Sequence, residues 1–153
     1  MHSRIFQVSM SPIKKDDYIC EDIYYDHWFT YQIADYVDDN TDRNEDIKRL
    51  SECYNCLTFS ADENGEFFIV DSKEKYFKSS FEQFTDALKK IQTYSLEDFA
   101  TGIGEMWTLQ HAYEDKHGFY IDADGELMTL DSFVRRCATG EKYYIGATID
   151  YHC

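Results

Sequence analysis

Two short segments with the same turn signal constrain the fold of this chain most. Residues 62–72 (Asp-Glu-Asn-Gly-Glu-Phe-Phe-Ile-Val-Asp-Ser) align without gaps with residues 122–132 (Asp-Ala-Asp-Gly-Glu-Leu-Met-Thr-Leu-Asp-Ser). In each segment Asn-Gly or Asp-Gly follows one apolar stretch and precedes another, and such pairs accept the positive φ that tight turns require. The pattern predicts β-hairpins at 56–71 and 118–129, each leading towards a helix. Repeated use of hairpin chemistry and an ancient duplication both explain the similarity.

The two ends of the chain also have the character of strands. Residues 4–10 alternate between polar and apolar side chains, and residues 143–151 form a long β-prone stretch. A lone long strand would leave its backbone groups unpaired. We therefore expect these two segments to pair or to neighbour each other in one sheet that also contains both hairpins.

Helical periodicity lies between these strands. Over residues 21–37 apolar side chains recur on one face, with acids and aromatic residues opposite, which predicts an amphipathic helix. Asp42, followed three residues later by Glu45, predicts a capped helix that reaches about residue 54.

The second half of the chain contains three more helix signals. Ser79 and Ser80 predict the start of a helix that runs to residue 91, and Ser95 predicts the start of another, bent near its glycines. Asp131 predicts the cap of a short helix that closes at a glycine.

Neither linker composition nor low-complexity sequence interrupts these elements. The length of 153 residues fits one domain. We therefore expect a single α+β domain over residues 1–153, with a mixed or antiparallel sheet of about five to six strands and helices packed on it.

Charge narrows the class of partner. The chain has 30 acidic and 15 basic residues, a net charge of −15, and the excess lies in two blocks. Residues 16–46 hold eleven acids and one base, and residues 97–131 hold nine acids and one base. Direct binding to nucleic acid or to an anionic membrane requires a basic surface, so the charge argues against both and favours a basic partner.

The setting of the chain follows from what its sequence lacks. No apolar run approaches the ~20 residues that span a bilayer, and the first residues lack the apolar core of a signal peptide. We expect a cytoplasmic protein. Its five cysteines show no framework spacing, which predicts reduced thiols.

No motif of known chemistry is complete. Cys53 and Cys56 have the spacing of half a zinc site, but no second such pair exists. The turns at 62–65 and 122–125 resemble calcium loops but lack the first carboxylate. We therefore predict no catalytic residues, no cofactor and no metal. A spatially assembled Cys/His site would leave no sequence signature, so a small enzyme stays an alternative.

The remaining candidate is the acidic and aromatic side of the first block. Aromatic anchors within a charged rim are typical of binding hot spots, and arginines in a basic groove bind carboxylates much as they bind phosphates. Small acidic tyrosine-rich proteins of this kind include DNA mimics such as antirestriction and anti-CRISPR inhibitors. We expect a non-enzymatic protein that occupies a basic, nucleic-acid-binding surface of a partner protein; an acidic structural or adaptor subunit is a further alternative. The residues that we expect to contact the partner are Tyr24, Trp28, Tyr31, Asp35, Asp38, Asp39 and Asp42.

Overall fold

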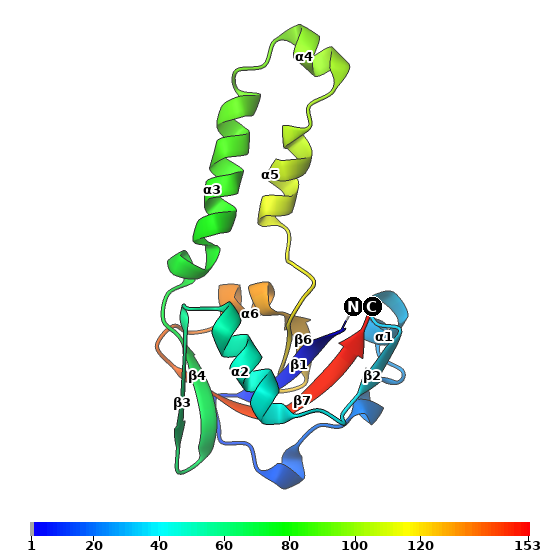
Figure 1. The fold of residues 1–153 in the computed structure, drawn as a ribbon, viewed down its shortest axis with the longest axis vertical. Coiled ribbons are helices and arrows are strands. Elements are labelled where there is room, and N and C mark those ends of the chain that lie inside the picture. Colours follow the sequence, from blue (N-terminus) through cyan, green and yellow to red (C-terminus); the bar gives the residue numbers. More distant parts are fainter. Residues whose placement is uncertain (1) are drawn as a thin grey trace.

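The computed structural model describes residues 2–153, and seven strands in these residues form one mixed sheet (Figure 1). The order across the sheet is β3-β4-β7-β1-β5-β6, and β2 pairs with β7 beside this path. The α+β class is confirmed, with seven strands where about five to six were predicted. The strands are β1 (His2–Ser9), β2 (Tyr36–Asp38), β3 (Leu57–Asp62), β4 (Gly65–Val70), β5 (Tyr120–Ala123), β6 (Glu126–Thr129) and β7 (Lys142–His152).

The pairing of the terminal strands is confirmed. β1 and β7 run antiparallel at the centre of the sheet, with His2 opposite His152 and Ser9 opposite Tyr144. Both predicted hairpins form, β3–β4 on one side of this pair and β5–β6 on the other. β5 joins β1 in parallel, which makes the sheet mixed.

The helices differ more from the sequence prediction than the strands do. Asp42 caps α2 as predicted, since its side chain accepts hydrogen bonds from the backbone N–H groups of Asn44 and Glu45. Ser95 and Asp98 form a capping box at α4. The helical segments are η1 (Lys15–Asp17), η2 (Glu21–Tyr24), α1 (Trp28–Gln32), α2 (Arg43–Cys53), α3 (Lys73–Ile91), α4 (Leu96–Thr101), α5 (Glu105–Tyr113) and α6 (Leu130–Arg136), where η denotes a 3₁₀ turn.

Three predicted helix boundaries are wrong. α3 begins six residues before Ser79, because the Ser72 side chain already accepts from the N–H of Lys75. The helix expected after Ser95 is divided into α4 and α5, since Gly102 adopts a φ of 109° that no helix contains. Thr129, and not Asp131, caps α6.

The helix predicted over residues 21–37 does not form as one element. This segment contains the 3₁₀ turn η2, the short helix α1 and the strand β2. The reason is tertiary: β2 pairs with the last residues of β7, and this ladder competes with helix formation. The apolar residues Phe29, Ala34 and Val37 are buried as predicted, whereas Ile23 is exposed.

β7 contains one extra residue opposite β1. Thr148 faces Phe6 and Ile145 faces Val8, so three steps of β7 correspond to two steps of β1. Such a bulge reverses which side chains point to which face of the sheet. The odd-numbered residues of β7 therefore enter one core before the bulge and the other core after it.

The two cores lie on opposite faces, because consecutive residues of β1 belong to different ones. Phe6 contacts the first core, under α2, α6 and the beginning of α3. Ile5 contacts the second core, which η2 and α1 cover and to which Val37 of β2 contributes. Tyr143 and Ile145 enter the first core and Ile149 and Tyr151 the second.

Side chains satisfy the backbone groups that the bulge leaves without strand partners. Arg43 donates from Nε to the carbonyl oxygen of Gly146 at 2.6 Å and from Nη2 to that of Ile145 at 2.7 Å. Gln7 accepts from the N–H of Ala147 at 3.0 Å. These bonds stabilise the bulge where neither β4 nor β2 reaches β7.

α3, α4 and α5 form an arm that leaves the sheet (Figure 1). At its base Arg135 stacks between the rings of Phe77 and Tyr113, with its Cζ 4.3 and 4.7 Å from the ring centroids. Tyr76 donates its hydroxyl to Asp131 at 2.6 Å. These contacts fix the direction of the arm relative to the sheet.

None of the helices within residues 2–153 combines the length and the apolar character needed to cross a bilayer.

We predict that Gly146→Ala destabilises the fold through the bulge. The added methyl group would collide with Gln7 Oε1 and displace the side chain that accepts from Ala147. Losing this partly buried hydrogen bond should lower the free energy of unfolding by about 0.5–1.5 kcal/mol. Urea denaturation measures this difference. Gly118→Ala is the matched control, because the methyl group added there would meet no atom within 4 Å; equal midpoints for both variants would contradict the prediction.

Candidate functional site

Within residues 16–46, η2 and α1 cover one face of the sheet, and Tyr24 is their central anchor. Its side chain is buried and its hydroxyl donates to Asp122 Oδ2 at 2.7 Å. Burial, and next the charge of Asp122, raise the pKa of Tyr24, so this hydroxyl stays protonated. Tyr24 was predicted to lie on the exposed face, and that prediction is wrong. Its partner lies 98 residues away in the sequence, so local periodicity could not reveal it.

Trp28 and Tyr31 lie on the surface, as predicted. Both belong to α1, and 42 % of Trp28 and 72 % of Tyr31 are exposed. Phe29, between them, fills the core beneath and contacts the rings of Tyr120 and Tyr151. α1 thus holds two exposed aromatic side chains on a buried support.

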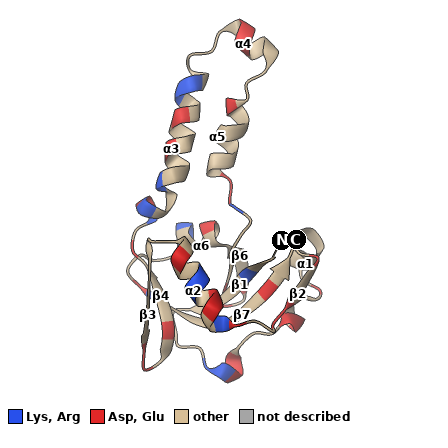
Figure 2. Ribbon diagram, viewed as in Figure 1, with Lys and Arg blue, Asp and Glu red and all other residues tan. Residues whose placement is uncertain are grey.

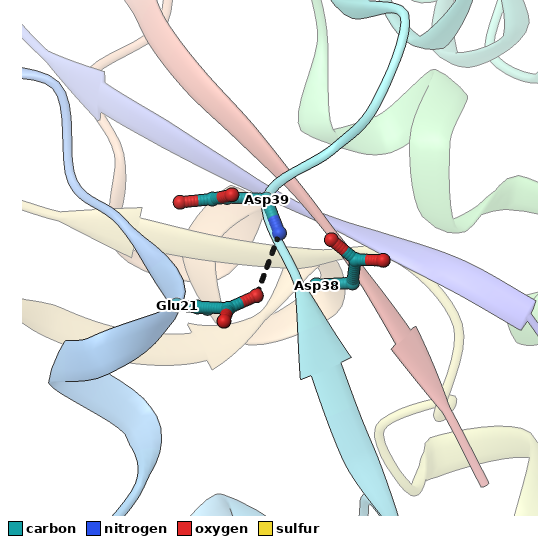
Figure 3. A group of neighbouring side chains, drawn as sticks. All are labelled: Glu21, Asp38 and Asp39. Carbon is teal, nitrogen blue, oxygen red and sulfur yellow. Dashed lines mark hydrogen bonds between the residues drawn. The ribbon is translucent and has the colours of Figure 1, made fainter.

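Glu21, Asp38 and Asp39 bring three carboxylates together (Figure 3). Glu21 comes from η2, Asp38 ends β2 and Asp39 follows it, and one oxygen of each carboxylate lies within 4.8 Å of one oxygen of the other two. The backbone N–H of Asp39 donates to Glu21 Oε2 at 3.2 Å. Across residues 2–153 no lysine, arginine or histidine forms an ion pair with these three groups.

Asp35 and Asp42 lie at the two ends of the same region and have different roles. Asp35 is exposed at the start of β2, and its carboxylate lies 3.1 Å from His152 Nδ1. Asp42 is already engaged as the cap of α2. The structure thus places Asp35, Asp38 and Asp39 along β2 and just beyond its end, and these residues together with Glu21 are called the acidic edge below. Asp42 instead stabilises a helix terminus.

The sequence reasoning missed two exposed tyrosines of this edge. Tyr25 donates to Glu21 Oε1 at 2.9 Å, and this hydrogen bond raises the pKa of Tyr25. Tyr36 stacks on His152 with ring centroids 5.6 Å apart. The helical wheel assumed for residues 21–37 gave no reason to single out either residue, but the alternation of β2 places Tyr36 outward and Val37 inward.

Residues of the two acidic blocks meet in two places. Asp17 of the first block and Asp122 and Asp124 of the second line a cavity of about 230 Å³. A cavity of about 560 Å³ is lined by Trp28 of the first block and by Glu114 and Asp115 of the second. Elsewhere the arm takes residues of the second block away from the sheet. The two blocks therefore adjoin at these two cavities, whereas the acidic residues of α4 lie far from the sheet (Figure 2).

The polar groups of the larger cavity are engaged with one another. His117 Nδ1 lies 2.7 Å from the hydroxyl of Tyr120. Burial chiefly, with Tyr151 nearby, raises the pKa of Tyr120 to about 12. Thr129 donates to Asp115 at 2.7 Å, and Ser132 donates to the same carboxylate.

These contacts bear on the enzyme alternative. Ser132 bonds to a carboxylate and not to an imidazole, and Tyr120 is protonated at neutral pH. The cavity therefore provides no activated nucleophile from these groups.

Neither the Cys53 and Cys56 pair nor the turns at 62–65 and 122–125 form a metal site with other residues in the part of the chain that the structure describes. Cys56 is buried, and burial raises the pKa of its thiol, whereas Cys53 is exposed; no disulfide joins them. Asp62 receives Lys142 Nζ at 2.7 Å and Asp122 receives the N–H of Gly125 at 2.9 Å. Both turn carboxylates thus stabilise their hairpins. Within residues 2–153 the one cluster of three groups that could hold a cation is Glu21, Asp38 and Asp39.

Comparisons of the chain with protein-family models, with curated proteins and with solved structures give no match.

We predict that Asp115 contributes to the acid sensitivity of the fold. Burial would raise the pKa of Asp115, but hydrogen bonds from Ser132 and Thr129 and the charge of Arg135 outweigh burial and lower it. A carboxyl with a lowered pKa in the folded state stabilises above its unfolded pKa of ~3.9, and this stabilisation disappears as the pH falls through the folded pKa.

The free energy of unfolding of Asp115→Asn should therefore lie below that of the wild type at neutral pH. The gap should narrow as the pH falls below ~4. Chemical denaturation at a series of pH values measures the gap. A constant gap across that range would contradict the assignment.

Proposed function

We propose that this chain is a non-enzymatic interaction protein that places its acidic edge on a basic surface of a partner protein. The observation that carries the proposal is the cluster of Glu21, Asp38 and Asp39, whose carboxylates have no cationic partner within residues 2–153 and lie beside exposed aromatic rings. Carboxylates without a cationic partner repel each other, and this repulsion is relieved when cations approach.

The kind of partner follows from the chemistry of the edge. Arginine side chains bind carboxylates through two parallel hydrogen bonds, as they bind phosphates. A groove that grips nucleic acid supplies such arginines in a row. We therefore propose a nucleic-acid-binding groove as the partner surface, which would make this chain a DNA-mimic-like inhibitor of the antirestriction or anti-CRISPR kind acting in the cytoplasm.

The arrangement of α1 supports close packing of its exposed aromatic side chains against the partner protein. Trp28 and Tyr31 are partly exposed on a segment whose remaining ring, Phe29, is fixed in the core. Rigid aromatic side chains lose little entropy on binding and are enriched in hot spots. The edge thus combines long-range attraction with short-range anchors.

Two alternatives stay open for experiment. A small enzyme would use a Cys/His site assembled by the fold, and an acidic structural or adaptor subunit would use the charge only for solubility. Capture of partners from a cell lysate on the immobilised chain, at low and high salt, separates these classes. The proposal requires captured proteins that duplex DNA or RNA displaces and that salt releases.

We predict that replacing Asp35, Asp38 and Asp39 by Asn slows association with the captured partner. Steering depends on the field of the whole edge, so the rate constant for association should fall several-fold at low salt and converge with that of the wild type at high salt. Stopped-flow or surface plasmon resonance measures these rates.

The matched control also removes three negative charges, but at residues outside the first acidic block. Glu52, Glu63 and Glu141 are exposed and lie outside residues 16–46. Their replacement by Gln should alter the association rate less than the edge variant does. Equal rates for the edge variant and the wild type at low salt would identify the edge as a solubility surface.

We predict that Trp28→Ala acts on dissociation instead. An aromatic anchor makes its contacts after the encounter, so its loss should raise the dissociation rate constant about tenfold or more with little change in association. A melting curve accompanies this measurement, because 42 % exposure leaves part of the ring packed on Phe29. An unchanged dissociation rate in a folded variant would remove Trp28 from the interface.

A further inference from the structure

The arm formed by α3, α4 and α5 exposes many large apolar side chains to solvent. Ala87 and Ala112 are the fully buried residues of α3 and α5 within the described chain. Large apolar side chains on the arm surface include Phe81 (65 % exposed), Leu88 (38 %), Leu96 (83 %), Phe99 (70 %), Met106 (51 %), Trp107 (66 %) and Tyr113 (67 %). Exposed apolar side chains grouped on one element mark an interaction surface.

The spacing of these residues on α3 is that of a helix-packing seam. Phe77, Phe81, Phe84, Leu88 and Ile91 follow one another at intervals of four, three, four and three residues. That heptad spacing packs one helix against others. α5 covers the Ala87 side of the seam and leaves the Phe81 side exposed.

A groove runs along the uncovered side. Two adjoining cavities of about 350 and 490 Å³ share Phe84 and Tyr113 in their walls. Phe81 lines the first, while Met106 and Trp107 line the second. The groove therefore extends along both α3 and α5.

The charges of the arm are complementary to one another (Figure 2). α3 contains five lysines and three acids, so it has a net positive charge within an acidic chain. Residues 92–115, which include α4 and α5, contain five acids and neither lysine nor arginine. In a two-fold symmetric interface each copy gives the same patch, so a basic helix beside an acidic one meets its complement twice.

We propose that two copies of this chain associate through their arms, with α3 of each copy along α4 and α5 of the other. The arms run antiparallel, so that the tip of one arm meets the base of its partner. This orientation holds the two acidic bodies at opposite ends, separated by the length of α3, about 28 Å at 1.5 Å per residue. A parallel arrangement would place two charges of −15 side by side.

The exposed aromatic side chains of the arm supply half or more of the area that such a dimer needs. Phe81, Phe99, Trp107 and Tyr113 are each about two-thirds exposed. At ~150–250 Å² per aromatic side chain they offer roughly 400–700 Å² per copy. Stable interfaces bury about 800 Å² per partner, which neighbouring residues of the groove complete.

The first experiment measures mass against concentration. Sedimentation or light scattering of the full chain should show a dimer that dissociates on dilution. Phe81→Glu should be monomeric throughout the same range, while Ser79→Glu, which adds the same charge at an exposed polar position of α3, should still dimerise. Circular dichroism confirms that both variants are folded. A wild type that stays monomeric, or a Phe81→Glu variant that dimerises like the wild type, would overturn the proposal.

The second experiment tests the orientation. Lys78 lies near the base of the arm and Glu97 at its tip, so the antiparallel dimer brings them together across the interface. Lys78→Glu and Glu97→Lys should each weaken self-association about tenfold or more through like-charge contacts. An equimolar mixture of the two variants should restore the wild-type dimer. No recovery in the mixture would reject the antiparallel pairing.

These experiments are independent of the acidic edge. Phe81, Lys78 and Glu97 all lie outside residues 16–46, and the readout is self-association without any partner protein. A failed capture experiment and a monomeric chain are therefore distinguishable outcomes.

Discussion

The bulge in β7 is the constraint on which the arrangement of the rest depends. A single strand of 11 residues contributes to cores on both faces of the sheet because one extra residue near Gly146 reverses its alternation. Without that reversal, Tyr143 and Tyr151 would point to the same side, and one of the two helical layers would lose its support. Arg43 in the first turn of α2 and Gln7 on β1 stabilise the bulge from either side of β7.

The chain uses part of its acidity for its own structure. Asp46 is buried and receives Arg4 Nε at 2.5 Å and the hydroxyl of Thr148 at 2.9 Å. Asp122 and Asp131 accept hydrogen bonds from the hydroxyls of Tyr24 and Tyr76. Charge-assisted bonds of this kind are shorter and stronger than neutral ones. Hydroxyl donors and Arg4 thus satisfy these buried carboxylates, whereas Glu21, Asp38 and Asp39 lie together near the end of β2 without a cationic partner in residues 2–153.

Local signals in the sequence predicted the elements whose partners are close in the chain. The hairpins, the Asp42 cap and the Ser95 capping box depend on residues within a few positions, and all form. The helix predicted over residues 21–37 does not form, because the structure of this segment is decided by β7, more than 100 residues later in the sequence. The exposure of Trp28 and Tyr31 could be predicted from the polar side of the assumed helix. The burial of Tyr24 could not, because its partner Asp122 is distant in the sequence. The arm was also invisible as a unit, since periodicity identifies an apolar stripe but not whether the molecule covers it.

The acidic edge and the arm make different demands on the fold. Electrostatic attraction acts over about a Debye length, ~8–10 Å in physiological salt, so the edge needs only to hold its charges on a fixed surface. β2 does this by pairing with β7, and Asp35 is tied to His152 of the same strand. Apolar contacts act only when surfaces meet. The arm must therefore extend far enough that two copies can touch while their acidic bodies, which repel each other, stay apart. Its fixed base, with Arg135 between Phe77 and Tyr113, provides that reach. A strongly charged protein that self-associates through an extended apolar arm would thereby keep its acidic edge open to a second, basic molecule.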